Sequence, residues 1–204
     1  MFEIIAMVTM LIDHIGGAFF PDQPWFRIIG RLAMPLYTYG IVQGYRYTRN
    51  FKKYLLRLLL IASTSQVFYT LLFREYRPNI VFTFIVCLLL LKYFIESKDR
   101  AFLKYYIVIN ATIFLQLFQF SYGAYAFILT LIYYYNKRII LNHNLLNIAA
   151  YFVNGWTLQL YSFVASILIK YVPNPRLTGH MRTFYTIFYP LHLAVLVLID
   201  RLIH

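Results

Sequence analysis

The sequence predicts an all-α, polytopic membrane protein, a bundle of about eight transmembrane helices. Of its 204 residues, 61% are hydrophobic and 13% are charged, and the mean hydropathy is +0.63. A soluble domain needs a larger polar surface than this composition supplies. The apolar residues also form runs long enough to cross about 30 Å of hydrocarbon at about 1.5 Å of rise per residue.

Eight such runs follow one another, and short segments rich in helix breakers separate them. The runs cover residues 2–20, 26–46, 54–73, 79–96, 103–120, 121–136, 145–171 and 184–203. In the same order, the separators lie at 21–24, 49–50, 77–79, 97–100, 121–123, 136–144 and 173–179. The run at 121–136 is the shortest, because a tight turn precedes it. We expect one integral membrane domain over residues 1–204.

The formal net charge of +12 is explained by membrane topology. Basic residues gather after the second, fourth and sixth runs, and fewer lie at the opposite ends of the helices. The positive-inside rule then places both chain termini in the cytoplasm, N-in and C-in, and the excess charge attracts anionic lipid. No nucleic-acid partner is expected, because no aromatic-basic binding module or zinc-ligand spacing accompanies the charge.

Asp13 and His14 stand deep in the first run, where ionisable groups are costly and mark functional sites. His14 lies roughly 18 Å from the inner end of its helix, and His192 lies roughly 12 Å from the outer end of the last helix. In a core of about 30 Å these are the same depth, so the two histidines are predicted to share one cavity. The alternative for His14 is a hydrogen-bonded core histidine.

The last run carries Tyr185, Tyr189 and His192 at positions i, i+4 and i+7, so one stripe of this helix is polar and aromatic. Pro190 removes a backbone donor and is expected to kink the helix, which frees a carbonyl near His192. A kink that is merely tolerated in the bundle, with His192 bonded to a neighbouring helix, is the alternative.

Arg27 and Arg31 are four residues apart in the second run and therefore share a helix face. Arg31 lies too deep to reach lipid headgroups and needs an anionic partner, for which Asp13 is the natural candidate. The pair Asp13–Arg31 is either a structural ion pair or a source of positive charge for a reacting site, and the two roles are compatible.

Further polar groups in the runs are expected to form hydrogen bonds between helices. They are Gln43, Gln66, Thr83, Asn110, Gln116, Asn154 and Gln159. A basic cluster, Arg46, Arg49, Lys52 and Lys53, follows the second run. It serves topology and lipid contact, or it binds the phosphates of a cytoplasmic, nucleotide-like donor.

Several segments, in this order and spacing, resemble the TraX family, whose namesake acetylates the amino terminus of conjugal pilin. They are TMLIDHIG at 9–16, RIIGRLAMPL at 27–36, GYRYTRN at 44–50, KYLLRL at 53–58, NIVFT at 79–83 and YPLHL at 189–193. Met34 replaces the usual Phe of the family. Residues 100–180 offer no motif that matches, and acceptor specificity is expected to reside there.

The resemblance implies a multi-pass protein of the bacterial plasma (inner) membrane, grouped with transmembrane acyltransferases that use acetyl-CoA and a catalytic His in an early membrane helix. It makes His14 the catalytic residue, with Arg31 and His192 near the site. We expect His14 to act as general base or to carry the acetyl group itself. Arg31, fixed by Asp13, would stabilise the oxyanion, and His192 and Tyr189 would orient the acceptor.

In this hypothesis, acetyl-CoA is the co-substrate, no metal takes part, and Arg46, Arg49, Lys52 and Lys53 bind the donor phosphates. The acceptor is a peptide amino terminus, as in a pilin-like protein, or a hydroxyl such as that of a glycan. Two alternatives remain. One is a non-enzymatic membrane component of a conjugation or secretion apparatus, and the other is a proton-coupled carrier that uses His14 and Asp13 as a relay.

Overall fold

A computed structural model describes residues 2–97, 100–135, 137–173 and 179–203, with side chains in the last range from 183 onward. All regular secondary structure in these ranges is helical, which confirms the predicted fold class. The elements are α1 (Phe2–Phe19), α2 (Pro24–Gly30), α3 (Ala33–Tyr47), α4 (Phe51–Phe73), α5 (Ile80–Glu96), α6 (Ala101–Leu117), α7 (Gly123–Tyr135), α8 (Ile139–Asn154), the 3-10 helix η1 (Thr157–Ser162), α9 (Phe163–Tyr171) and α10 (Gly179–Ile203). The predicted separators at 97–100, 136–144 and 173–179 lie partly outside the described residues.

Two of the predicted runs are not continuous helices. The run at 26–46 is divided into α2 and α3 at Arg31 and Leu32. Pro35 explains the break, because in a continuous helix its ring would clash with the carbonyl of Arg31, whereas the first turn of a new helix tolerates proline. The run at 145–171 is divided into α8, η1 and α9 after Gly155, whose φ of 68° is left-handed.

Within the described residues, three helices are long and apolar enough to cross a membrane. They are Phe2–Phe19, Phe51–Phe73 and Thr183–Ile203, and Ala101–Leu117 and Gly123–Tyr135 are shorter apolar helices. The chain is therefore a membrane protein by the length and composition of its helices. The number of eight crossings stays a prediction.

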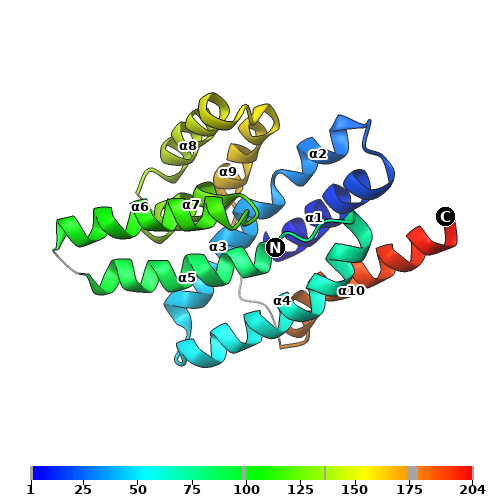
Figure 1. Ribbon diagram of the computed structural model, residues 1–204, viewed down its shortest axis with the longest axis horizontal. Coiled ribbons are helices and arrows are strands. Elements are labelled where there is room, and N and C mark those ends of the chain that lie inside the picture. Colours follow the sequence, from blue (N-terminus) through cyan, green and yellow to red (C-terminus); the bar gives the residue numbers. More distant parts are fainter. Residues whose placement is uncertain (1, 98–99, 136, 174–178, 204) are drawn as a thin grey trace.

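The first and last helices run in the same direction, and α4 runs alongside them (Figure 1). Tyr185, near the start of α10, stacks on Tyr37 of α3, and two turns later His192 meets His14 in the second half of α1. The beginning of α1 and the end of α10 therefore lie at opposite ends of the bundle. This arrangement differs from the predicted one, in which both termini face the same side, so N-in and C-in is not confirmed.

The hairpin formed by α8, η1 and α9 accounts for that difference. Nδ1 of His143 in α8 lies 2.6 Å from Oγ of Ser166 in α9, and Nδ2 of Asn147 donates to Oγ of Ser162 at 3.0 Å. Because rising residue numbers in α8 meet falling numbers in α9, the two helices are antiparallel. The seventh predicted run thus turns back on itself, which reverses the direction in which α10 begins.

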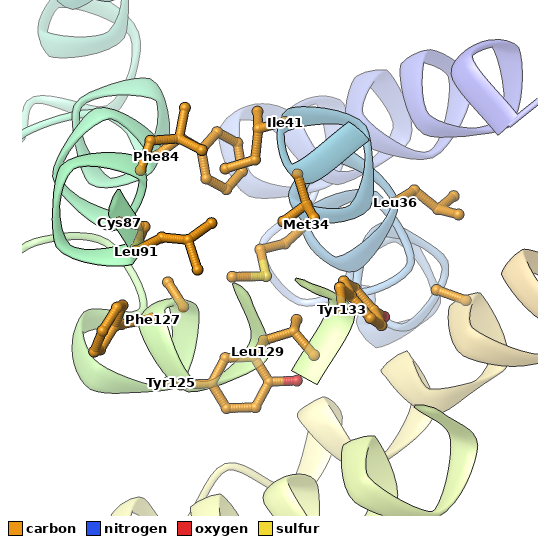
Figure 2. Packing of buried hydrophobic residues seen from close by; sticks show 14 of the residues in the cluster. Met34, Leu36, Ile41, Phe84, Cys87, Leu91, Tyr125, Phe127, Leu129 and Tyr133 are labelled. Carbon is orange, nitrogen blue, oxygen red and sulfur yellow. The ribbon is translucent and has the colours of Figure 1, made fainter. Parts of the chain in front are cut away.

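The main hydrophobic core lies where α3, α5 and α7 meet. Met34 of α3 lies between Phe84 and Leu91 of α5 on one side and Leu129 and Tyr133 of α7 on the other (Figure 2). All five side chains are at most 5% exposed. A second cluster joins α1, α4 and α10, and α3 lies between the two groups of helices (Figure 1).

Two glycines allow α1 and α2 to approach each other closely. A Cβ atom at Gly16 would overlap the side chain of Phe26, and one at Gly30 would overlap the side chain of Asp13. The absence of side chains at these positions is what places Asp13 directly against the end of α2.

We expect Gly30→Ala to destabilise the fold by about 1–3 kcal/mol, because the new methyl group has no space beside Asp13. Gly40→Ala is the matched control. Its Cβ would meet only the hydroxyl of Tyr185 at 3.3 Å, and alanine is a better helix former than glycine by up to about 1 kcal/mol. Thermal unfolding in detergent should show a lower midpoint for the first variant and an equal or higher one for the second. Equal midpoints would contradict the close approach of α1 and α2.

Candidate active site

One cavity of about 1570 Å³ lies between α1, α3, α4 and α10. At one end it is lined by Tyr47, Thr48 and Arg57, and at the other by Glu75 and Arg77. We call these the Thr48 end and the Arg77 end. They flank the two ends of α4, whose 23 residues span about 34 Å. The cavity therefore follows the length of the bundle.

His14 and His192 meet at one depth in the bundle, as predicted, but of the two only His14 lines the cavity that they were expected to share. Nδ1 of His14 is 2.7 Å from Nε2 of His192, and the two rings are nearly parallel, 14° apart, with centroids 5.0 Å from each other. His14 lines the cavity, and so does Tyr189. The Tyr189 ring meets the imidazole of His14 edge-on, with the ring centroids 6.2 Å apart. His192 is 5% exposed and does not line the cavity.

Asp13 is paired with Arg27, and the predicted pair with Arg31 is wrong. Nη1 of Arg27 donates to Oδ2 of Asp13 at 3.0 Å and to the Asp13 carbonyl at 3.3 Å. Arg27 lies in α2, which packs on α1, whereas Arg31 follows the end of α2 and donates from Nη1 to Oη of Tyr122 at 2.8 Å. The backbone N–H of Arg31 still donates to the Arg27 carbonyl at 3.1 Å, so the two arginines stay one helical turn apart, and Arg27 is the one whose guanidinium bonds to Asp13.

Tyr122 is a site residue that the sequence analysis did not identify. It lines the cavity, and its φ of 63° is left-handed, which is rare and costly for a bulky side chain. The preceding Ser121 holds the turn by donating from Oγ to the Pro78 carbonyl at 3.0 Å. Strain of this kind persists where the surrounding structure imposes it, and here it presents the phenol to Arg31.

Four buried polar atoms on cavity-lining residues have no hydrogen-bond partner among the described residues. They are Oδ1 of Asp13, Nε of Arg31, Oη of Tyr37 and Oη of Tyr189. An unpaired buried polar atom costs about 1–3 kcal/mol, so a group of them around one cavity favours a polar ligand or water there. Oδ1 of Asp13 is pressed against Gly30, so its lack of a partner follows from the close contact of α1 and α2.

The four basic residues predicted to bind the donor lie at the Thr48 end but do not line the cavity. Arg46 places its guanidinium over the ring of Tyr134, 5.0 Å from the centroid. Arg57, one turn beyond Lys53 in α4, lines the cavity and also lies over Tyr54 at 5.8 Å. The cation that reaches the cavity from α4 is therefore Arg57. Among the described residues, no three His, Cys, Asp or Glu are grouped to hold a metal ion.

A second polar cluster holds α7, α8, η1 and α9 together. Both ring nitrogens of His143 form hydrogen bonds. Nε2 lies 2.8 Å from Oη of Tyr125, and Nδ1 lies 2.6 Å from Oγ of Ser166. Nε2 of Gln159 donates to the same Tyr125 hydroxyl at 2.9 Å. The full set is Tyr125, Tyr133, His143, Asn147, Gln159, Ser162 and Ser166, all at most 5% exposed.

Only Gln159 of this cluster lines the cavity, and it was the one member predicted to bond between helices. Its other members carried no recognisable motif in the sequence. Because its donors and acceptors bond to one another, the cluster fixes the α8–α9 hairpin to α7 and so holds Gln159 at the cavity.

Comparison with known proteins gives a consistent family match. A family model described as TraX protein matches residues 1–200. The chain is 28% identical, over 227 aligned residues, to the probable fimbrial assembly protein FimC, serogroup H1, of Dichelobacter nodosus, covering 95% of this chain and 92% of that protein. It is 32% identical over 74 residues to an uncharacterized protein of Rickettsia prowazekii (strain Madrid E), covering 36% and 28%. No solved structure matches.

We expect Arg27→Gln and Asp13→Asn each to destabilise the fold by about 1–3 kcal/mol. Each substitution leaves one charge of a largely buried ion pair without its partner. The expected loss of stability is smaller than for a fully buried pair, because the Arg27 side chain is 33% exposed. The double variant should lose less free energy of unfolding than the sum of the losses of the two single variants. Chemical denaturation of the four proteins in detergent measures this coupling.

Arg77→Gln is the control for that cycle. Its contact with Glu75 is long, 3.9 Å, and exposed, so the free energy of unfolding should change by less than about 0.5 kcal/mol. Additive effects of the Asp13 and Arg27 changes would show that the pair contributes no stability.

Proposed function

The chain belongs to the TraX family, and from this premise and the geometry of the cavity we propose that it is a membrane-embedded acetyltransferase. It moves an acetyl group from acetyl-CoA to an amine or hydroxyl acceptor. The observation that carries the proposal is a single cavity that extends from the basic Thr48 end to the Arg77 end and has His14 on its wall. A donor and an acceptor that arrive from opposite ends would meet at this imidazole.

The reaction needs a base for the acceptor proton and a positive group for the developing oxyanion. The imidazole of His14 takes the proton from the acceptor N–H or O–H as that atom bonds to the thioester carbonyl carbon. The tetrahedral oxyanion then collapses, the C–S bond breaks, and the thiolate of CoA takes the proton back from His14. The products are the acetylated acceptor and free CoA, so atoms and charge balance.

Arg31 is the group suited to the oxyanion. Nη1 is held by Tyr122, and Nε is buried without a partner among the described residues. A donor fixed in place by its own hydrogen bond loses little free energy on meeting the oxyanion, and it acts strongly where water is excluded. Asp13 is bound to Arg27 and acts on the site through the position of α2.

The donor would bind from the Thr48 end. Arg57 lines that end, and Arg46, Arg49, Lys52 and Lys53 surround it with positive charge suited to phosphates. The 15 residues of α3 rise about 22 Å between this end and Ala33, which lines the same cavity as His14. An extended arm with a thioester at its tip fits such a path.

The acceptor would bind from the Arg77 end, where Tyr69, Phe73 and Tyr189 form an aromatic wall near His14. The similarity to a probable fimbrial assembly protein favours a pilin-like peptide, and a glycan hydroxyl has the same chemistry. On this proposal the protein acts in the bacterial plasma membrane with the Thr48 end in the cytoplasm, as its basic residues favour.

We expect His14→Gln to lower acetyl transfer at least 10²-fold, the lower bound of general base catalysis, with insertion and thermal stability retained. Transfer to surface proteins and glycans is followed by mass spectrometry of cells that carry each variant. Thr9→Ala on the same helix is the control, since its hydroxyl bonds only to carbonyls of its own helix. Full acetylation by the glutamine variant would exclude His14 as the base.

Acetyl-CoA should raise the unfolding midpoint of the protein in detergent, because a ligand of the native state stabilises it by about 2.7 kcal/mol at 100 times its Kd. Arg57→Gln should reduce this shift more than Lys53→Gln, because only the arginine lines the cavity. No shift at millimolar acetyl-CoA would favour the non-enzymatic assembly component instead.

A further inference from the structure

The ring of His192 is held at both nitrogens. Nδ1 lies 2.7 Å from the backbone carbonyl oxygen of Phe188, one turn earlier in α10, and Nε2 lies 2.7 Å from Nδ1 of His14. The phenyl ring of Phe188 also stacks on the imidazole, with centroids 4.9 Å apart. Both distances are short, so both contacts are hydrogen bonds.

The first contact determines where the proton of His192 resides. A carbonyl oxygen only accepts hydrogen bonds, so Nδ1 of His192 must carry the proton. A neutral imidazole has one N–H, so Nε2 of His192 is an acceptor. Nδ1 of His14 faces this acceptor and must therefore donate to it.

Because His14 carries its single proton on Nδ1, its Nε2 has no proton. No described residue forms a hydrogen bond with that atom, and His14 lines the cavity. The lone pair of Nε2 is thus the basic site that remains available to a ligand.

We propose that His192 is a positioning residue, which holds His14 in the Nδ1–H tautomer and makes Nε2 of His14 the atom that accepts the acceptor proton. The inference rests on the proposed acetyl transfer and names the reacting atom of that site. His192 touches neither substrate in this assignment, because it lies behind His14 and does not line the cavity. His192 and Tyr189 were both expected to orient the acceptor. Of the two, only Tyr189 lines the cavity, so this role is assigned to Tyr189.

The hydrogen bond also supports the charged intermediate. When Nε2 of His14 takes the acceptor proton, the imidazolium still donates from Nδ1 to His192, and this bond is stronger because the donor is then charged. The backbone of α10 fixes this series of hydrogen bonds, since the Phe188 carbonyl at its start belongs to that helix. The logic is that of a triad in which the orienting group is a histidine fixed by a backbone carbonyl.

The test is 15N NMR of the full-length protein in detergent micelles, labelled in its five histidines. The two nitrogens of a neutral imidazole differ widely in shift according to which one carries the proton. His14→Gln and His192→Gln spectra assign the two residues. We expect the proton of His14 on Nδ1, and that of His192 also on Nδ1.

Two variants of His192 complete the test. His192→Phe keeps the ring volume and removes the acceptor, so His14 should leave the Nδ1–H tautomer and kcat should fall roughly 10- to 100-fold, the cost usual for losing the partner that orients a functional histidine. KM for acetyl-CoA and the acetyl-CoA thermal shift should not change. His192→Gln places an amide oxygen near the former Nε2 and should retain kcat within about threefold of the wild type by the same reasoning. Leu191→Ala, at an exposed position of α10, controls for changes in the helix.

A proton on Nε2 of His14 in the wild type would overturn the inference. So would a phenylalanine variant that keeps both the Nδ1–H tautomer and the wild-type kcat. If the tautomer is as expected but no acetyl transfer occurs with any acceptor, the tautomer assignment stands and the proposed function fails. The NMR measurement needs no turnover, which keeps the two failures apart.

Discussion

The structure depends on one constraint: an ionisable side chain inside an apolar bundle must find a partner, because unpaired charge there costs several kcal/mol. Asp13 and His14 are adjacent on α1 but point to different neighbours. Asp13 binds Arg27 of α2, and His14 binds His192 of α10. The polar positions of the first helix thus tie together elements from both ends of the chain, and Gly16 and Gly30 allow the close approach of α1 and α2 on which the Asp13 contact depends.

The residues of these contacts also border the cavity. The His14 imidazole, the Arg31 guanidinium and the Tyr37 and Tyr189 phenols belong to residues that line the space between α1, α3, α4 and α10. This space is a cavity that connects a basic end to an opposite end and leaves Nε of Arg31 unpaired. In the proposed function, His14 would be the base and Arg31 the fixed cation of an acyl transfer.

The other side of the molecule supports this arrangement without taking part in it. The cluster around His143 satisfies its own hydrogen bonds within α7, α8, η1 and α9, and it stabilises the hairpin that carries Gln159 to the cavity. Met34 and its neighbours in α5 and α7 supply the hydrophobic counterpart (Figure 2). Polar and apolar packing together hold the strained turn at Tyr122 in place.

The amino-acid sequence was enough to predict the helical fold class, the positions of most helices, the family and the common depth of His14 and His192, because composition, hydropathy and helix spacing are local properties. The pairing of Asp13 with Arg27, the role of Tyr122, the His143 cluster, the lining residue Arg57 and the direction of α10 required the tertiary structure. Each of these depends on a helix break or on a contact between residues distant in the chain. Spacing along one helix cannot show which neighbour a side chain meets once that helix ends.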